Sequence, residues 1–89
     1  MLDPDSVRDE ASFLAFVSEL AADRRHAASQ EANAYGAQAG WENRTIEGFL
    51  ESALAWAEDT SFGRTQGMQE DTSVWQRVAV FLYCGKIYE

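Results

Sequence analysis

The chain has one cysteine, one proline and one histidine among its 89 residues. The lone Cys84 excludes a disulfide within the chain, and one cysteine with one histidine falls short of the three or four ligands of a zinc site. Basic residues are also few, with 7 Lys and Arg against 15 Asp and Glu and a net charge of -8. Such a chain repels phosphate backbones and anionic membrane surfaces, so we expect neither nucleic acid nor a membrane as its partner.

Long apolar runs and phosphate-binding motifs are missing as well. No run approaches the roughly 20 residues that cross a bilayer. The start, Met-Leu-Asp-Pro-Asp, lacks the basic and apolar regions of a signal peptide, so we expect a cytoplasmic protein. Gly63 and Gly67 are not followed by the lysine of a phosphate-binding loop. A hydrophobic content of 46% in a chain this short predicts one domain, residues 1–89, with one core.

The segment from about residue 9 to residue 25 predicts an amphipathic helix. Its large apolar residues recur at the i, i+3, i+4, i+7 spacing of one helix face: Phe13, Phe16, Val17 and Leu20. Ser6 and Asp9 are candidate caps, and Pro4 lies before the helix, where it leaves the interior unbroken. In residues 27–40 alanine favours a longer helix, but the glycines favour a loop, which we expect to be mobile.

A second helix is predicted to begin near Asn43 or Thr45, whose side chains can accept bonds from free backbone amides, and to run to about Asp59. One face of this helix is apolar: Ile46, Phe49, Leu50, Ala53 and Ala57. Leu54 and Trp56 flank that face on opposite sides. The exposed face carries an acidic stripe: Glu47, Glu51 and Glu58.

Residues 60–70 contain two glycines and few apolar residues, which predicts a second loop. Asp71 or Thr72 can then cap a third helix that is apolar on most sides, with this main face: Trp75, Val78, Ala79 and Leu82. We expect Gly85 to end the helix in the left-handed conformation, with Ile87 folding back onto the last turn. A helix this apolar is either central or shared with another chain, for example in a homodimer. The predicted fold is an all-α, compact three-helix domain with two irregular loops.

Several of these residues form a pattern along the chain: Trp41-Glu42-Asn43 with Thr45, Phe49-Leu50, Trp56 and Asp59, Trp75, and the closing Gly85-Lys86-Ile87-Tyr88-Glu89. The pattern resembles a family of small bacterial proteins known as a domain of unknown function. The resemblance covers most of the chain, from the first helix to the last residue. It implies a compact helical domain and a bacterial origin, and it supplies no activity and no catalytic residue.

The residues themselves offer little for catalysis. Cys84 lies in an apolar helix without a neighbouring base, which indicates a small buried or half-buried thiol rather than a nucleophile. His26 and Asp23 share a helix face, as metal ligands can, but a solvated helix end is the better interpretation. The acidic run offers paired carboxylates in principle, yet Glu47 and Glu51 at i, i+4 are neighbours of like charge on an outward face.

The three tryptophans are the largest side chains of the sequence. Trp56 and Trp75 are expected in the core or at its edge. Trp41 precedes the second helix by a few residues, which leaves two alternatives. It packs back onto that helix near Ile46 or Phe49, or it stands partly exposed as a recognition residue.

Taken together, these features predict a non-enzymatic, acidic domain that binds another protein with a basic surface. The predicted binding residues are Trp41, Glu42, Glu47, Glu51, Glu58 and Tyr88. We expect no cofactor, no metal and no catalytic residue. Small acidic bacterial proteins that neutralise basic toxins have this profile, so an immunity-like role is one form of the hypothesis. The alternative is a small enzyme or ligand-binding protein with a pocket lined by Trp56, Asp59 and Trp75.

Overall fold

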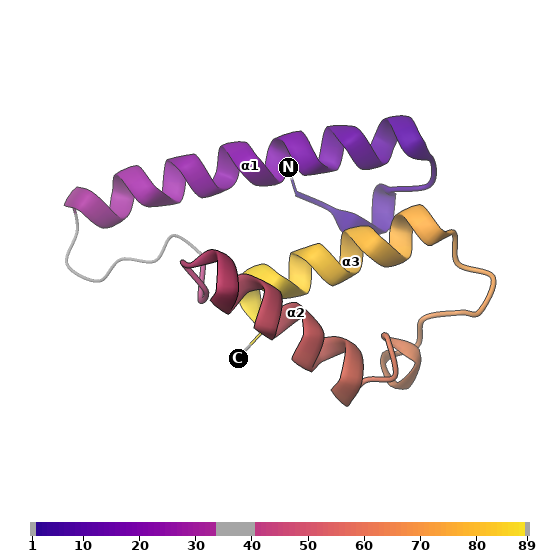
Figure 1. Cartoon of the computed structure of the whole chain (residues 1–89). Helices are drawn as coiled ribbons and strands as arrows, with labels where there is room; N and C mark the ends of the chain where they lie inside the picture. The colour runs from indigo at the N-terminus through magenta and orange to yellow at the C-terminus, as the bar shows by residue number, and fades with distance from the viewer. Residues whose placement is uncertain (1, 34–40, 89) are drawn as a thin grey trace.

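The computed structural model describes residues 2–33 and 41–88 and contains three α-helices and two short 3-10 helices (Figure 1). In chain order they are η1 (Pro4–Ser6), α1 (Glu10–Asn33), α2 (Ile46–Asp59), η2 (Arg64–Gln66) and α3 (Val74–Ile87). No strand occurs among the described residues. The prediction of an all-α, three-helix domain is confirmed.

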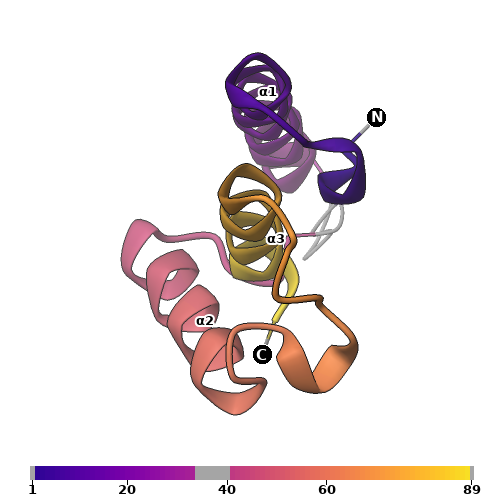
Figure 2. The same ribbon diagram turned by 90° about the vertical axis from the view of Figure 1, so that its right-hand side faces the viewer.

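Helix α3 is the central element. Both α1 and α2 pack against it, and η1 covers its amino-terminal half (Figure 1). Seen along its length, α3 lies between the other two helices (Figure 2). A helix this apolar was expected to be either central or shared with another chain. In the structure of this chain α3 is the central helix. The core is a cluster of residues from α1, α3, the residue after η1 and the entry to α2: Val7, Phe16, Leu20, Ala27, Trp41 and Ala79.

Helix α1 is longer than predicted, because it continues past Arg25 to Asn33. Alanine and glutamine favour helix in this segment, and Ala27 is fully buried in the core, so a tertiary contact adds to local propensity. The loop expected over residues 27–40 is thus wrong for its first half, and residues 34–40 lie outside the described part of the chain. At the other end, Asp9 accepts a hydrogen bond from the Ser12 amide at 2.9 Å, as a helix cap does.

Helix α2 begins as predicted, with Thr45 as its cap, because the Thr45 hydroxyl accepts a bond from the Gly48 amide at 3.0 Å. Its buried face differs from the prediction. Trp56, expected at the flank, is buried together with Ala53, whereas Ile46 is 78% exposed and Leu50 is 52% exposed. The apolar face of α2 is wide enough for the helix to pack in two orientations. In the observed one Trp56, the side chain with the larger apolar area, is buried.

Helix α3 differs from the prediction at both ends. Its cap is Ser73, which accepts a bond from the Gln76 amide, rather than Asp71 or Thr72. At its other end Gly85 does not terminate the helix. It is helical and buried, and the helix continues to Ile87, which is exposed and does not fold back.

The loop predicted after α2 is present and begins with a tight turn. Ser61, Phe62 and Gly63 all have positive φ values. Such a conformation is strained for a phenylalanine, but the Phe62 ring stacks on Phe81 at 5.6 Å and meets the edge of Trp56 at 5.5 Å. The turn therefore fastens the end of α2 to the middle of α3.

Candidate functional site

A buried polar cluster lies where the chain enters α2. The Trp41 side chain is 4% exposed, and its indole nitrogen donates a hydrogen bond of 2.8 Å to Asp23 Oδ2. The Lys86 ammonium lies 2.7 Å from the same oxygen. Asp23 follows Leu20 by three residues and precedes Ala27 by four, so helical spacing places it on the core-facing side of α1. One carboxylate thus joins α1, the entry to α2 and the end of α3.

Cations surround the Trp41 ring of this cluster. The Arg24 guanidinium lies 5.4 Å and the Lys86 ammonium 5.7 Å from the ring centroid, both within range of a cation–π attraction. Burial acts to raise the pKa of the Asp23 carboxyl, but the hydrogen bonds from Lys86 and Trp41 outweigh it and hold that pKa below its ordinary value. Asp23 therefore stays ionised near neutral pH, which suits a structural ion pair and not a general acid.

The two residues after Trp41 bind the last turn of α3. The Glu42 amide donates to the Lys86 carbonyl at 3.0 Å. The Asn43 side-chain amide donates to the carbonyls of Gly85 at 3.0 Å and Tyr88 at 2.8 Å. A helix end leaves carbonyls without intrahelical partners, and these donors satisfy them. The Trp-Glu-Asn segment and the carboxy-terminal tail thus form one structural junction.

Tyr88 extends this junction to the end of α2. Its hydroxyl donates a hydrogen bond of 2.6 Å to Asp59 Oδ2. That bond raises the pKa of the Tyr88 phenol, because ionisation would remove the shared proton and place two negative charges together. The Tyr88 side chain is half-buried, and Glu89 lies outside the described residues.

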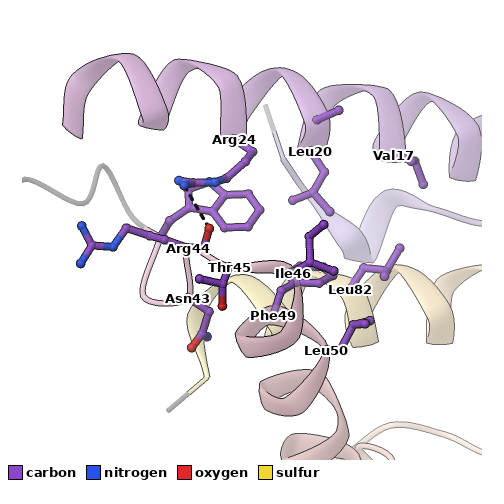
Figure 3. Close-up of a pocket in the computed structure, with 12 residues that line it drawn as sticks. Val17, Leu20, Arg24, Asn43, Arg44, Thr45, Ile46, Phe49, Leu50 and Leu82 are labelled. Carbon is purple, nitrogen blue, oxygen red and sulfur yellow. Dashed lines mark hydrogen bonds between the residues drawn. The ribbon is translucent and has the colours of Figure 1, made fainter. Parts of the chain in front are cut away.

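An apolar groove lies next to the junction, between α1 and α2, and its cavity has a volume of about 430 Å³ (Figure 3). We refer to it as the α1/α2 groove. Its apolar walls come from all three helices: Val17, Leu20, Ile46, Phe49, Leu50 and Leu82. Arg24 and Arg44 lie at the same end, where Arg24 donates to the Arg44 carbonyl at 3.3 Å and the Arg44 guanidinium points outward, away from the apolar walls. A volume of this size is typical of a ligand or peptide site.

The outer face of α2 carries two parallel stripes. Ile46, Leu50 and Leu54, four residues apart, are between 52% and 78% exposed. The acidic stripe of Glu47, Glu51 and Glu58 is also exposed and lies about 100° further round the helix from Ile46. The structure therefore has the three predicted glutamates on one surface, beside an exposed apolar stripe whose Ile46 and Leu50 were predicted on the apolar face of the helix and whose Leu54 was predicted at the flank of that face.

The other predicted binding residues lie at the junction. Glu42 is exposed, while Trp41 is buried and its ring stacks on Phe49 at 6.0 Å. Of the two alternatives for Trp41, the structure has the packed one. Its indole nevertheless forms part of the lining of the α1/α2 groove.

The alternative pocket of Trp56, Asp59 and Trp75 is not assembled. Trp56 is buried, donates to Gln66 Oε1 at 2.9 Å and borders a second cavity of about 310 Å³. Asp59 is exposed and bonded by Tyr88, so it does not point inward as that hypothesis required. Trp75 packs on Phe13, with ring centroids 5.4 Å apart.

The described part of the chain holds neither a metal centre nor an activated thiol. Within residues 2–33 and 41–88, no three His, Cys, Asp or Glu side chains gather as metal ligands would. Cys84 is half-buried, and burial raises the pKa of its thiol to about 11. A thiol with so high a pKa is protonated at neutral pH and is a poor nucleophile.

Sequence reasoning missed three features of the site: the Asp23–Lys86 pair, the α1/α2 groove and its arginine end. Asp23 carried a detectable signal, because a charged residue on the core-facing side of a helix requires a partner. Its partner Lys86 is 63 positions away, beyond the reach of any periodicity. The groove could not be predicted from the sequence either, because its lining residues are far apart in the chain.

Among the described residues no helix has the length and apolar character to cross a bilayer.

Comparison with known proteins identifies the family alone. No curated protein and no solved structure matches the chain. A family model described as a family of unknown function (DUF7660) matches residues 9–89, so the chain belongs to this family.

Proposed function

We propose that this protein is a non-enzymatic interaction module that binds a partner protein with a basic surface. The observation that carries the proposal is the pair of exposed stripes on α2, one apolar and one acidic. Exposed leucine and isoleucine side chains in a row are a surface that binding would bury. The glutamates beside them select a basic partner and accelerate its association.

The junction supports this proposal indirectly. Trp41, Asn43 and Tyr88 bind other parts of the chain, so they hold the ends of α2 and α3 in place. A surface on a rigid helix loses little conformational entropy when a partner binds. The high net negative charge is consistent with an immunity-like protein that neutralises a basic toxin, which is the specific form of the proposal.

The test begins with recovery of the partner from the native host, using the full chain as bait. The association rate of that partner is then measured for wild type and for the Glu47→Lys, Glu51→Lys, Glu58→Lys variant at low and high salt. We expect the variant to associate about tenfold more slowly or worse at low salt, with most of the difference lost at high salt.

A matched control has the same change in net charge elsewhere on the surface. Glu10, Glu70 and Asp71 are exposed and lie outside α2, so their triple replacement by lysine serves this purpose. If the control variant slows association as much as the α2 variant does, the effect reflects net charge alone. The outer face of α2 would then not be the binding surface.

A further inference from the structure

The α1/α2 groove has the shape of a site for a fourth helix. Helices α1 and α2 both pack on α3 (Figure 2), and the groove lies between them, with Leu82 of α3 contributing to its wall (Figure 3). A helix placed there would contact all three helices of the domain. Amphipathic helices that bind proteins commonly lie in apolar grooves of this kind.

Apolar side chains extend beyond the cavity itself. On α1, the three- and four-residue steps between Leu14, Val17, Ala21 and Arg24 place these residues on one face of the helix. Leu14 lies outside the cavity lining, and its exposed side chain continues the apolar surface. On α2, Leu54 continues the row of Ile46 and Leu50. The ten helical steps from Leu14 to Arg24 correspond to about 15 Å, or nearly three turns of a bound helix. A small molecule would leave much of this surface uncovered.

The charged residues around the groove favour one orientation of a bound helix. Arg24, Arg25 and Arg44 are three of the seven Lys and Arg residues of the chain, and Arg24 and Arg44 line the same end of the groove. Helix α2 also begins at this end, with the partial positive charge of a helix amino terminus. Along the outer side of α2 the charge is negative, through Glu47, Glu51 and Glu58.

We infer that the occupant of the α1/α2 groove is an amphipathic helix of the partner protein, bound with its carboxy-terminal end at Arg24 and Arg44. The negative end of its dipole and carboxylates in its last turn face these arginines. Lysines or arginines on one flank of the helix face the acidic stripe of α2. The inference rests on the proposed function and adds the class of partner segment and its orientation.

The direct probe is a pair of synthetic amphipathic peptides of about 15 residues, the length at which an isolated helix becomes stable enough to bind. Both have the same composition, the same apolar face and the same basic flank. The first has two glutamates and a free carboxylate at its carboxy-terminal end. The second has the same residues, with its glutamates at the amino-terminal end and a lysine at the carboxy-terminal end, and its terminal carboxylate is also free.

Titration of the full chain, followed by NMR, measures both affinity and location. We expect the first peptide to bind about tenfold more tightly than the second and to shift the methyl signals of Val17, Leu50 and Leu82. Equal affinity for the two peptides, absence of binding by either, or shifts confined to other surfaces would overturn the inference.

Two pairs of matched variants refine the test. Leu50→Gln should weaken the first peptide about tenfold, while Val74→Gln, at a similarly exposed apolar position on α3 outside the cavity lining, should not. Arg44→Glu should abolish the preference between peptides, while Arg64→Glu in η2 should leave it unchanged. An unaffected preference in Arg44→Glu contradicts the proposed orientation.

The same variants separate this inference from the proposed function. A recovered partner that depends on Glu47, Glu51, Glu58 and Leu50 but not on Arg44 would leave the function standing and remove the proposed binding mode in the groove. Self-association of the protein that Leu50→Gln abolishes would instead identify the occupant as a second copy of this chain, and the inference of a partner helix would fail.

Discussion

Gly85 lies so close to Phe49 that a Cβ atom at Gly85 would be 2.9 Å from the Phe49 carbonyl oxygen and 3.0 Å from its ring. The oxygen belongs to the backbone of α2, so it cannot move aside as the end of a flexible side chain can. The absence of a side chain at Gly85 therefore sets how closely α2 and α3 approach each other. This close approach, and not the end of a helix, is what requires glycine here.

Replacement of Gly85 by alanine should destabilise the fold. In an exposed helix the same change stabilises by up to about 1 kcal/mol. Here the overlap with Phe49 should make the change destabilising, with the free energy of unfolding lowered by about 1 to 3 kcal/mol as in other overpacked cores. Urea denaturation of wild type and Gly85→Ala measures the difference. A variant as stable as wild type would show that α2 can shift away from α3 without cost.

Asp23→Asn should lower stability by about 1 to 3 kcal/mol at pH 7, because Lys86 stays buried without an ionised partner. The pKa of Asp23 is lower in the folded protein than its ordinary value of 3.8. The contribution of the ionised Asp23 to the stability of the fold is therefore present above about pH 4 and is lost as pH falls through the folded pKa. Urea denaturation from pH 7 to pH 2 should show the gap to wild type closing below pH 4. Asp71→Asn, at an exposed position, is the control and should behave as wild type does.

Asn43→Asp tests the cap on α3 with a side chain of nearly the same shape. Aspartate cannot donate to the carbonyls of Gly85 and Tyr88, and its charge would face both oxygens. We expect a loss of about 1 to 3 kcal/mol in urea denaturation. Faster amide exchange should also appear in the last turn of α3. Exchange that is unchanged there would mean that the Asn43 bonds do not hold this end.

Cys84 should react slowly with alkylating reagents. With a thiol pKa of about 11, its thiolate fraction at pH 8 is on the order of a thousandth. Mass spectrometry should show alkylation with iodoacetamide about a hundredfold slower in the folded chain than in concentrated urea. Because the chain has one cysteine, the adduct is assigned without ambiguity. Similar rates in both conditions would contradict the burial of this thiol.

The phenol of Tyr88 should titrate at higher pH than an ordinary tyrosine, because Asp59 accepts its proton in a hydrogen bond. Asp59→Asn removes the negative charge and should lower the pKa of Tyr88, as followed by the NMR signals of its ring. Glu58→Gln removes a neighbouring exposed charge that the Tyr88 hydroxyl does not contact, and it should have a smaller effect. Equal shifts in the two variants would argue against the specific bond.

Local chemistry was sufficient for the presence of three helices and for two of their caps, but not for the length of α1, which continues past Arg25 to Asn33. Asp9 and Thr45 begin α1 and α2 because their side chains bind amides three residues away, which is a property of a short segment. The cap of α3 was predicted at Asp71 or Thr72, one or two residues before the observed Ser73. All three side chains can accept such a bond. The tertiary geometry of the loop decided in favour of Ser73.

The orientation of the helices and the site were decided by the tertiary structure alone. Trp56 occupies the buried face of α2 and leaves Ile46 and Leu50 exposed, because a helix can bury only the part of a wide apolar face that meets its neighbour. The bond of Asp23 to Lys86 joins residues 63 positions apart, and such a pair depends on how α1 and α3 meet. The sequence by itself determined which segments become helical, through interactions within a few residues. Burial, the junction and the groove depend on contacts between distant segments, which only the packed structure defines.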